Sequence, residues 1–190
     1  MIEKDDLDIV VASLMDGKTL LYPTDTIWGI GCDATNAAAV EKIYALKQRD
    51  HSKSMLVLCA DIGMVERFVA PVDDTVRHLL LDGERPTTVI LPLSRGLLAP
   101  NLTAADGTIG VRIPRMAFCL SLLKEFGRPI VSTSANLSGQ PSPSCFADIS
   151  DALLEAVDCC APSRYEEHTG SVSSRILKPQ PDGTIAVLRP

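Results

Sequence analysis

Two cations, Lys47 and Arg49, stand two positions apart in an otherwise acidic chain, and Lys53 follows them closely. One interpretation is that Lys47 and Arg49 complement the negative end of the dipole of a helix that ends there. The other rests on their spacing, because residues i and i+2 of an extended segment point to the same side. An ammonium and a guanidinium placed in that way can bind one polyphosphate. The segment taken alone leaves both interpretations open.

Polar side chains also follow an apolar strand that is predicted to end near Val131. Ser132, Ser134 and Asn136 come directly after it. The crevice outside the carboxyl ends of strands is the usual ligand site of open α/β sheets. Hydroxyl and amide groups there can bind phosphates or a base without adding charge. The alternative is an ordinary Ser/Asn turn that satisfies its own backbone, and this motif alone does not decide between the two.

A third polar segment, residues 22–31, leaves another predicted strand and contains Thr24, Thr26, Trp28 and two glycines. Glycines would let the backbone approach a ligand closely, whereas Trp28 is most simply a core or pocket-wall residue. Arg112 lies on an otherwise apolar strand further along the chain. Burial of its guanidinium requires either an internal acid or an anionic ligand, and we favour the ligand.

These segments offer cations, hydroxyls and an amide, but no evident nucleophile with a base and an orienting acid. The sequence also contains no phosphate-loop, dinucleotide-binding, serine-elbow or H-E-x-x-H motif. Such a set suits a reaction that depends on positioning and charge neutralisation. Nucleotidyl transfer is such a reaction, because the protein mainly aligns an attacking oxygen with a phosphorus and neutralises developing charge.

The elements that must position these residues alternate between helix and strand. Helical periodicity, Asp at a helix start and Gly at helix ends predict the helices, and apolar runs predict the strands. The predicted helices cover 7–15, 36–47, a short segment after Asp61, 74–81, 116–126 and a segment through Leu153 and Val157; the predicted strands cover 19–22, 54–59, 87–93, 108–113, 129–133, 173–177 and 184–189. Residues 24–33 are expected to be a loop that joins the first strand to the second helix. The alternation and a closing hairpin predict an α/β fold with a mixed, parallel and antiparallel, sheet.

Length and composition limit the classes of protein that fit. A chain of 190 residues predicts a single domain that spans residues 1–190. Its net charge of −6 argues against a general nucleic-acid-binding surface. The purest apolar run, residues 55–60, is far shorter than the roughly 20 residues that cross a bilayer. Together with an acidic N-terminus, this predicts a cytoplasmic protein without membrane contact. The cysteines are scattered and are interpreted as buried small residues, with no metal site.

Taken together and in this order, the polar segments resemble the YrdC-like family of threonylcarbamoyl-adenylate synthases. The matching segments are Lys47 and Arg49 for the K-x-R motif, Ser134 and Asn136 for S-x-N, residues 22–31 for YPT[DE]T-[YW]-G-[LI]-G, and residues 110–114 for GVR-[IV]-P. The resemblance extends from Leu20 to the end of the chain. The chain departs from the family pattern at Asp50, Ser54 and Arg85, which affects loop geometry more than chemistry.

The resemblance implies a highly twisted mixed sheet with a concave, positively charged cavity. It implies formation of threonylcarbamoyl-AMP and pyrophosphate from L-threonine, bicarbonate and ATP, with Mg²⁺ carried by ATP. The product would serve tRNA modification through partner proteins, with tRNA or other double-stranded RNA as a further contact. The residues implied for ATP are Lys47, Arg49, Lys53, Ser132, Ser134, Asn136 and Arg189, with Lys47 and Arg49 as the catalytic pair; Thr24, Thr26 and Arg112 would face threonine. Ser173 is a weaker match.

On this interpretation, replacing Lys47 or Arg49 with alanine should abolish turnover and have little effect on folding. Two alternatives stay open. One is a catalytically silent RNA-binding module of the same fold, against which the acidic balance argues. The other is a paralogue that acts on another acyl or nucleotide substrate, against which the intact K-x-R and S-x-N motifs argue.

Overall fold

The structure is a computed structural model, and it describes residues 2–48, 50, 55–81, 84–167 and 172–190. Its strands join in the order β7-β1-β2-β6-β3-β5-β4-β8-β9. The strands are β1 (Leu20–Tyr22), β2 (Gly29–Gly31), β3 (Leu56–Leu58), β4 (Thr87–Pro92), β5 (Thr108–Arg112), β6 (Ile130–Ser134), β7 (Cys159–Cys160), β8 (Arg175–Pro179) and β9 (Ile185–Arg189). Parallel pairs such as β3–β5 alternate with antiparallel pairs such as β3–β6. The predicted mixed sheet is therefore confirmed, and the expectation of one domain stays a prediction.

Six α-helices flank the described sheet, and their ends follow local sequence signals. They are α1 (Lys4–Met15), α2 (Ala37–Lys47), α3 (Ile62–Phe68), α4 (Asp74–Leu81), α5 (Ala117–Phe126) and α6 (Asp151–Ala156). The Asn36 side chain accepts two backbone N–H groups at the start of α2, and Asp61 accepts one at the start of α3. Gly127 ends α5 at a φ of 71°, a left-handed conformation that glycine adopts without strain. Within the described residues, no helix is long and apolar enough to cross a membrane.

The segment 24–33 differs from its expected form, because it contains strand β2. This strand pairs antiparallel with β1 and with β6, so the chain makes a tight hairpin before it enters α2. The reason lies in Gly31, where an added Cβ would stand 1.9 Å from the carbonyl oxygen of Val131. That glycine lets two backbones approach each other rather than a backbone and a ligand.

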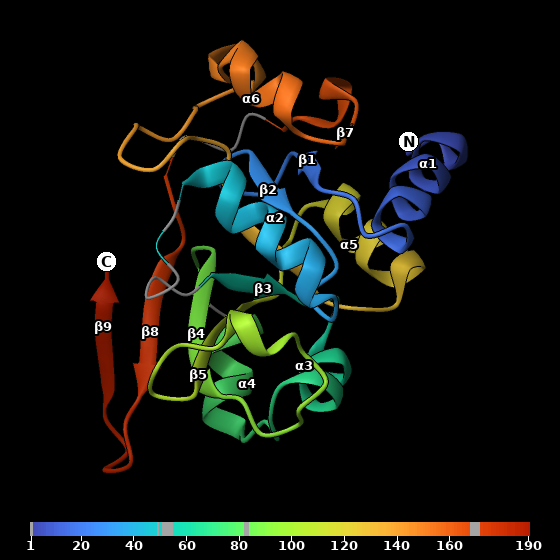
Figure 1. Ribbon diagram of the computed structural model, residues 1–190. Helices are drawn as coiled ribbons and strands as arrows, with labels where there is room; N and C mark the ends of the chain where they lie inside the picture. The colour runs from blue at the N-terminus through green and yellow to red at the C-terminus, as the bar shows by residue number, and fades with distance from the viewer. Residues whose placement is uncertain (1, 49, 51–54, 82–83, 168–171) are drawn as a thin grey trace.

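The two faces of the sheet are covered unequally. Side chains alternate along each strand, so Val57, Val111 and Val131 enter one large core beneath α2, α3 and α4. On the opposite face, Tyr22 and Leu58 enter a second core under α1 and α5. Figure 1 shows α1 and α5 side by side near one end of the sheet, with the β8–β9 hairpin near the other end. The second face is therefore only partly covered by helices, which leaves room for a cavity.

Candidate functional site

A cavity of about 260 Å³ lies on the face of the sheet that α1 and α5 cover only in part. Its wall follows the strand alternation: Gly110 and Arg112 on β5 face it, whereas Val111 between them enters the large core. The lining residues are Thr24, Thr26, Ile27, Trp28, Gly29, Met55, Leu56, Thr88, Ile90, Gly110, Arg112, Ser132, Thr133, Ser134, Ser142, Ser173, Ser174, Ile176 and Arg189. Six residues selected from the sequence, namely Thr24, Thr26, Arg112, Ser132, Ser134 and Arg189, thus share one cavity.

The Arg112 guanidinium is the most buried charge on the cavity wall, at 3% exposure. Its Nη1 donates to Thr26 Oγ1 at 2.8 Å and its Nη2 to Thr24 Oγ1 at 3.4 Å. Nη1 also lies 3.3 Å from Asp25 Oδ1, which is itself nearly buried. The interpretation that a ligand must justify this burial is corrected here, because Asp25 supplies an internal acid. Arg112 Nε is buried without a hydrogen-bond partner among the described residues.

The loop before β2 holds these hydroxyls in place through its own hydrogen bonds. Thr24 Oγ1 donates to the carbonyl oxygen of Ile27 at 2.7 Å and shares a hydrogen bond of 3.0 Å with Thr26 Oγ1. Asp25 Oδ2 accepts the backbone N–H of Arg115 at 3.0 Å, which ties the loop to the residues after β5. The two threonines and Arg112 therefore form one preorganised polar end of the cavity.

Trp28 is confirmed as a pocket-wall residue and is 2% exposed. Its indole Nε1 donates to Glu166 Oε1 at 2.7 Å, and the same oxygen accepts the backbone N–H of Phe146 at 2.9 Å. The Trp28 and Phe146 rings lie 5.0 Å apart at a tilt of 52°. Glu166 thus fixes a wall residue and a segment far along the chain with one carboxylate oxygen.

Lys47 lies behind the S-x-N segment, outside the cavity lining as the described residues define it. It is the last residue of α2 and is 1% exposed. Its Nζ donates to the carbonyl oxygen of Ser134 at 2.5 Å, to that of Asn136 at 2.7 Å and to Asn136 Oδ1 at 3.2 Å. The expectation that its loss would hardly affect folding assumed a side chain that serves a ligand rather than the core, whereas this ammonium is buried and binds three acceptors at the end of β6, so we expect a loss of stability.

The S-x-N segment is further held by bonds within itself. Ser134 Oγ donates to Asn136 Oδ1. Asn136 Nδ2 in turn donates to the carbonyl oxygen of Gln140 at 2.5 Å. The turn interpretation therefore describes Asn136, whose side chain bonds other groups of the same segment. The ligand interpretation fits Ser132 and Ser134, which line the cavity.

Arg189 brings a second guanidinium to the cavity from β9, the last strand of the sheet. Its Nε donates to the carbonyl oxygen of Ser174 at 2.8 Å and its Nη2 to Ser174 Oγ at 3.3 Å. Partial burial, and then the nearby positive charge of Arg112, lower the pKa of Arg189 from its usual value. Both guanidinium groups line the same cavity, so their positive charges repel each other there.

Arg49 and Lys53 lie outside the described residues, so their predicted roles stay predictions. Sequence reasoning missed Asp25, Thr88 and Ser174. The signal for Thr88 was present, because alternation along β4 places it on the same face as the cavity. Asp25 occupies the acidic position of the matched motif at residues 22–31, but the sequence does not show that it pairs with Arg112, because the contact between residues 25 and 112 depends on how the strands associate.

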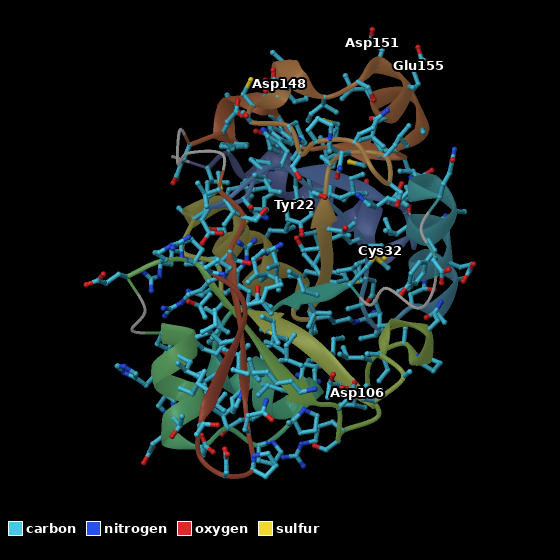
Figure 2. All side chains as sticks on the ribbon, turned by 90° about the vertical axis from the view of Figure 1, so that its left-hand side faces the viewer. Tyr22, Cys32, Asp106, Asp148, Asp151 and Glu155 are labelled. Carbon is cyan, nitrogen blue, oxygen red and sulfur yellow. The ribbon has the colours of Figure 1, made fainter. Side chains whose placement is uncertain are left out.

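Two potential nucleophiles, Tyr22 and Cys119, are buried next to the segment that leads from β1 to β2. Burial raises the pKa of the Tyr22 hydroxyl, which donates to the carbonyl oxygen of Val131 at 3.1 Å. Burial also raises the pKa of the Cys119 thiol, which donates to the carbonyl oxygen of Pro23 at 3.2 Å. Both groups are neutral at physiological pH, and Figure 2 shows Tyr22 inside the molecule while Asp151 and Glu155 project from its outer edge. Among the described residues, no group of three or more His, Cys, Asp or Glu could hold a metal ion.

Comparison with known proteins decides the family. A profile for Sua5, YciO and YrdC proteins, described as Telomere recombination, matches residues 12–190. The chain belongs to this family. A threonylcarbamoyl-AMP synthase of Chromohalobacter salexigens is 35% identical over 154 residues, which are 80% of this chain and 83% of that protein. A threonylcarbamoyl-AMP synthase of Bacillus subtilis is 37% identical over 70% of this chain and 38% of its own length.

Solved structures of this family share the fold over the whole chain. Sua5 of P. abyssi, crystallised in complex with L-threonine, gives a TM-score of 0.88 at 25% identity and covers 100% of this chain, which spans 55% of that protein. E. coli YciO gives a TM-score of 0.85 at 24% identity, with 100% of this chain and 90% of YciO covered. The likeness to YciO establishes the fold alone.

Proposed function

We propose that this protein forms threonylcarbamoyl-AMP and pyrophosphate from L-threonine, bicarbonate and ATP. The observation that carries the proposal is that two groups of polar side chains line one cavity. Arg112 with Thr24 and Thr26 forms one end, and β6 with Ser132 and Ser134 forms another part of the wall. Relatives of this chain are named threonylcarbamoyl-AMP synthases, and the Sua5 structure was determined with threonine.

The amino acid would bind at the Arg112 end. A guanidinium offers paired donors to a carboxylate, and Arg112 Nε has a donor that no described residue uses. Asp25 already balances one positive charge, so the Arg112 end is close to neutral before substrate arrives. The hydroxyls of Thr24 and Thr26 give this end hydrogen-bonding capacity without adding charge.

The nucleotide would lie along β6 and towards β9. Ser132 and Ser134 offer hydroxyls, and Arg189 offers a cation. Met55, Leu56 and Ile90 give the wall an apolar part that suits a base. Lys47 acts here through the backbone, because its three hydrogen bonds fix the position of Ser134 and Asn136. Arg49 and Lys53 complete the proposed set of phosphate ligands.

The chemistry needs little covalent participation by the protein. The threonine nitrogen forms a bond to the carbon of bicarbonate, and water is lost to give a carbamate. A carbamate oxygen then attacks the α-phosphorus of ATP, and the bond to the bridging oxygen breaks so that pyrophosphate leaves with the electron pair. Alignment of these groups and neutralisation of the phosphate charge are the contributions that the described residues can make.

Magnesium would enter as part of the substrate Mg-ATP. The described cavity wall presents hydroxyls and guanidinium groups but no carboxylate. This donor set fits an ion held mainly by phosphate oxygens and water, where it screens the triphosphate charge. Transfer of the product to tRNA through partner proteins, and action in the cytoplasm, belong to the same proposal.

The test is pyrophosphate release from ATP in reactions that contain or lack L-threonine and bicarbonate. We expect release only when both are present, together with mass-spectrometric detection of threonylcarbamoyl-AMP. Release that is independent of threonine, or dependent on another amine, would point to a paralogue with another substrate. Salt-sensitive binding of tRNA without any turnover would favour an RNA-binding module and contradict the proposal.

A further inference from the structure

Arg189 is held in the cavity by two linked hydroxyl groups, one on β4 and one on the residue before β8. Thr88 Oγ1 on β4 and Ser174 Oγ share a hydrogen bond of 2.8 Å. Ser174 then accepts two hydrogen bonds from Arg189, through its carbonyl oxygen at 2.8 Å and through Oγ at 3.3 Å. A guanidinium has donors only, so both oxygens of Ser174 act as acceptors towards it.

The hydroxyls of Thr88 and Ser174 are buried, whereas the Arg189 guanidinium that Ser174 binds is not. Thr88 is 1% exposed and Ser174 is 4% exposed. Arg189 is half-exposed, and no carboxylate among the described residues forms an ion pair with it. A buried hydroxyl needs a partner, so Thr88 and Ser174 fix each other, and through them the direction of Arg189. Without this pair, Arg189 would keep its hydrogen bond to the Ser174 carbonyl oxygen but lose the one to Ser174 Oγ, so the guanidinium would be less restricted in direction.

We propose that Thr88 and Ser174 are positioning residues that aim Arg189 at the polyphosphate of the nucleotide, which makes the closing β8–β9 hairpin part of the substrate site. This inference rests on the proposed function. It assigns a role to Thr88 on β4 and to Ser174 before β8, to neither of which sequence reasoning gave a role. Because Arg189 has no described acid partner, its charge is available to an anion, and its orientation sets how much of that charge an anion experiences.

The adjacent Thr87 provides a matched control. It lies on the same strand, is also buried, and has a hydroxyl that is at least as fully hydrogen-bonded, because its Oγ1 accepts from Arg175 Nε at 2.7 Å and donates to the carbonyl oxygen of Arg85 at 2.9 Å. Alternation along β4 points Thr87 to the opposite face, and it does not line the cavity. Valine at either position removes a hydroxyl and keeps the shape of the side chain. Comparing the two valine variants therefore separates the effect on Ser174 and Arg189 from the general effect of losing a buried hydroxyl on β4.

The experiment measures inorganic pyrophosphate binding by calorimetry, and the KM for ATP and for threonine, in Thr88→Val, Thr88→Ser and Thr87→Val. We expect Thr88→Val to weaken pyrophosphate binding and raise the KM for ATP by about fivefold, which corresponds to the loss of one hydrogen bond between neutral groups, here the bond that orients the Ser174 hydroxyl towards Arg189. The KM for threonine and kcat should change by less than about threefold. Thr88→Ser should restore binding, and Thr87→Val should match the wild type.

Several outcomes would overturn the inference. Equal pyrophosphate affinity in Thr88→Val and the wild type would do so, as would equal losses in both valine variants. A parallel loss of threonine affinity would mean that the cavity had distorted. Ser174→Ala, which keeps the backbone acceptor, serves as a second variant if Thr88→Val fails to fold. Pyrophosphate binding needs no turnover, so absence of synthase activity in the wild type would count against the proposed function and leave this comparison intact.

Discussion

The two guanidinium groups of the cavity belong to regions of opposite character. Arg112 lies on β5 in the middle of the sheet, is 3% exposed, and has Asp25 as an ion-pair partner. Arg189 lies on the edge strand β9, is half-exposed, and is bound by a hydroxyl and a carbonyl oxygen of Ser174. The charge of Arg112 is buried and ion-paired, whereas the charge of Arg189 is hydrogen-bonded only to neutral groups among the described residues. Burial and the ion pair make Arg112 part of the folded structure, whatever ligand it binds, whereas we expect that Arg189 can bind an anion at little cost to stability.

The largest effect that would test this comparison is expected at Arg112. Arg112→Gln leaves Asp25 buried without its counter-charge, which typically lowers the free energy of unfolding by about 3–5 kcal/mol. Urea titration followed by circular dichroism measures the change. The double variant Asp25→Asn with Arg112→Gln removes both charges and should recover much of the loss. A change below about 1 kcal/mol in the single variant would show that the pair is not structural.

A smaller effect on stability is expected at Lys47, which resembles Arg112 in its burial. Lys47→Met keeps most of the side-chain volume but removes three hydrogen bonds made by a buried ammonium, including the one to the carbonyl oxygen of Asn136, so the free energy of unfolding should fall by about 2–3 kcal/mol. Lys42→Met on the same helix is the control, because Lys42 is about half-exposed and its ion pair with Asp158 spans 3.8 Å. Lys42 also donates to the carbonyl oxygen of Gly17 at 3.0 Å, whereas the buried Lys47 donates to three acceptors. Urea titration should show less than about 1 kcal/mol for the control. Equal changes in the two variants would contradict the role assigned to Lys47.

Arg189→Gln should separate binding from stability. Because Arg189 is half-exposed and not ion-paired among the described residues, the free energy of unfolding should change by less than about 1 kcal/mol. Pyrophosphate affinity, measured by calorimetry, should fall at least about tenfold, since a cation is lost from the site. A large fall in the free energy of unfolding with unchanged pyrophosphate affinity would show that Arg189, like Arg112, is a structural residue, and would contradict this prediction.

The smallest effect concerns ionic strength. Exposed charges are screened by salt more strongly than buried ones. Raising KCl from about 50 mM to about 500 mM should therefore weaken pyrophosphate binding by the wild type several-fold, and by Arg189→Gln distinctly less. Binding isotherms at both salt concentrations provide the measurement. An identical salt dependence in both proteins would mean that Arg189 does not contribute its charge to the anion.

Local sequence signals predicted most of the elements but not all of them. Asn36, Asp61 and Gly127 mark helix ends by capping, which depends only on neighbouring backbone groups. Strand β2 was missed because three residues between two turns carry little periodicity, and its existence depends on pairing with β1 and β6. The short strand β7 was missed for the same reason.

The candidate site divides in the same way. The sequence by itself determined which residue types are available: the paired cations, the S-x-N segment, the two threonines and Arg112, each recognisable by type and spacing. Only the tertiary structure decided that Arg112 has Asp25 as its acid, that Lys47 binds backbone at the end of β6, and that Thr88 reaches Arg189 through Ser174. These contacts join residues far apart in the chain, and their partners are selected by strand order and register, which local propensity does not encode.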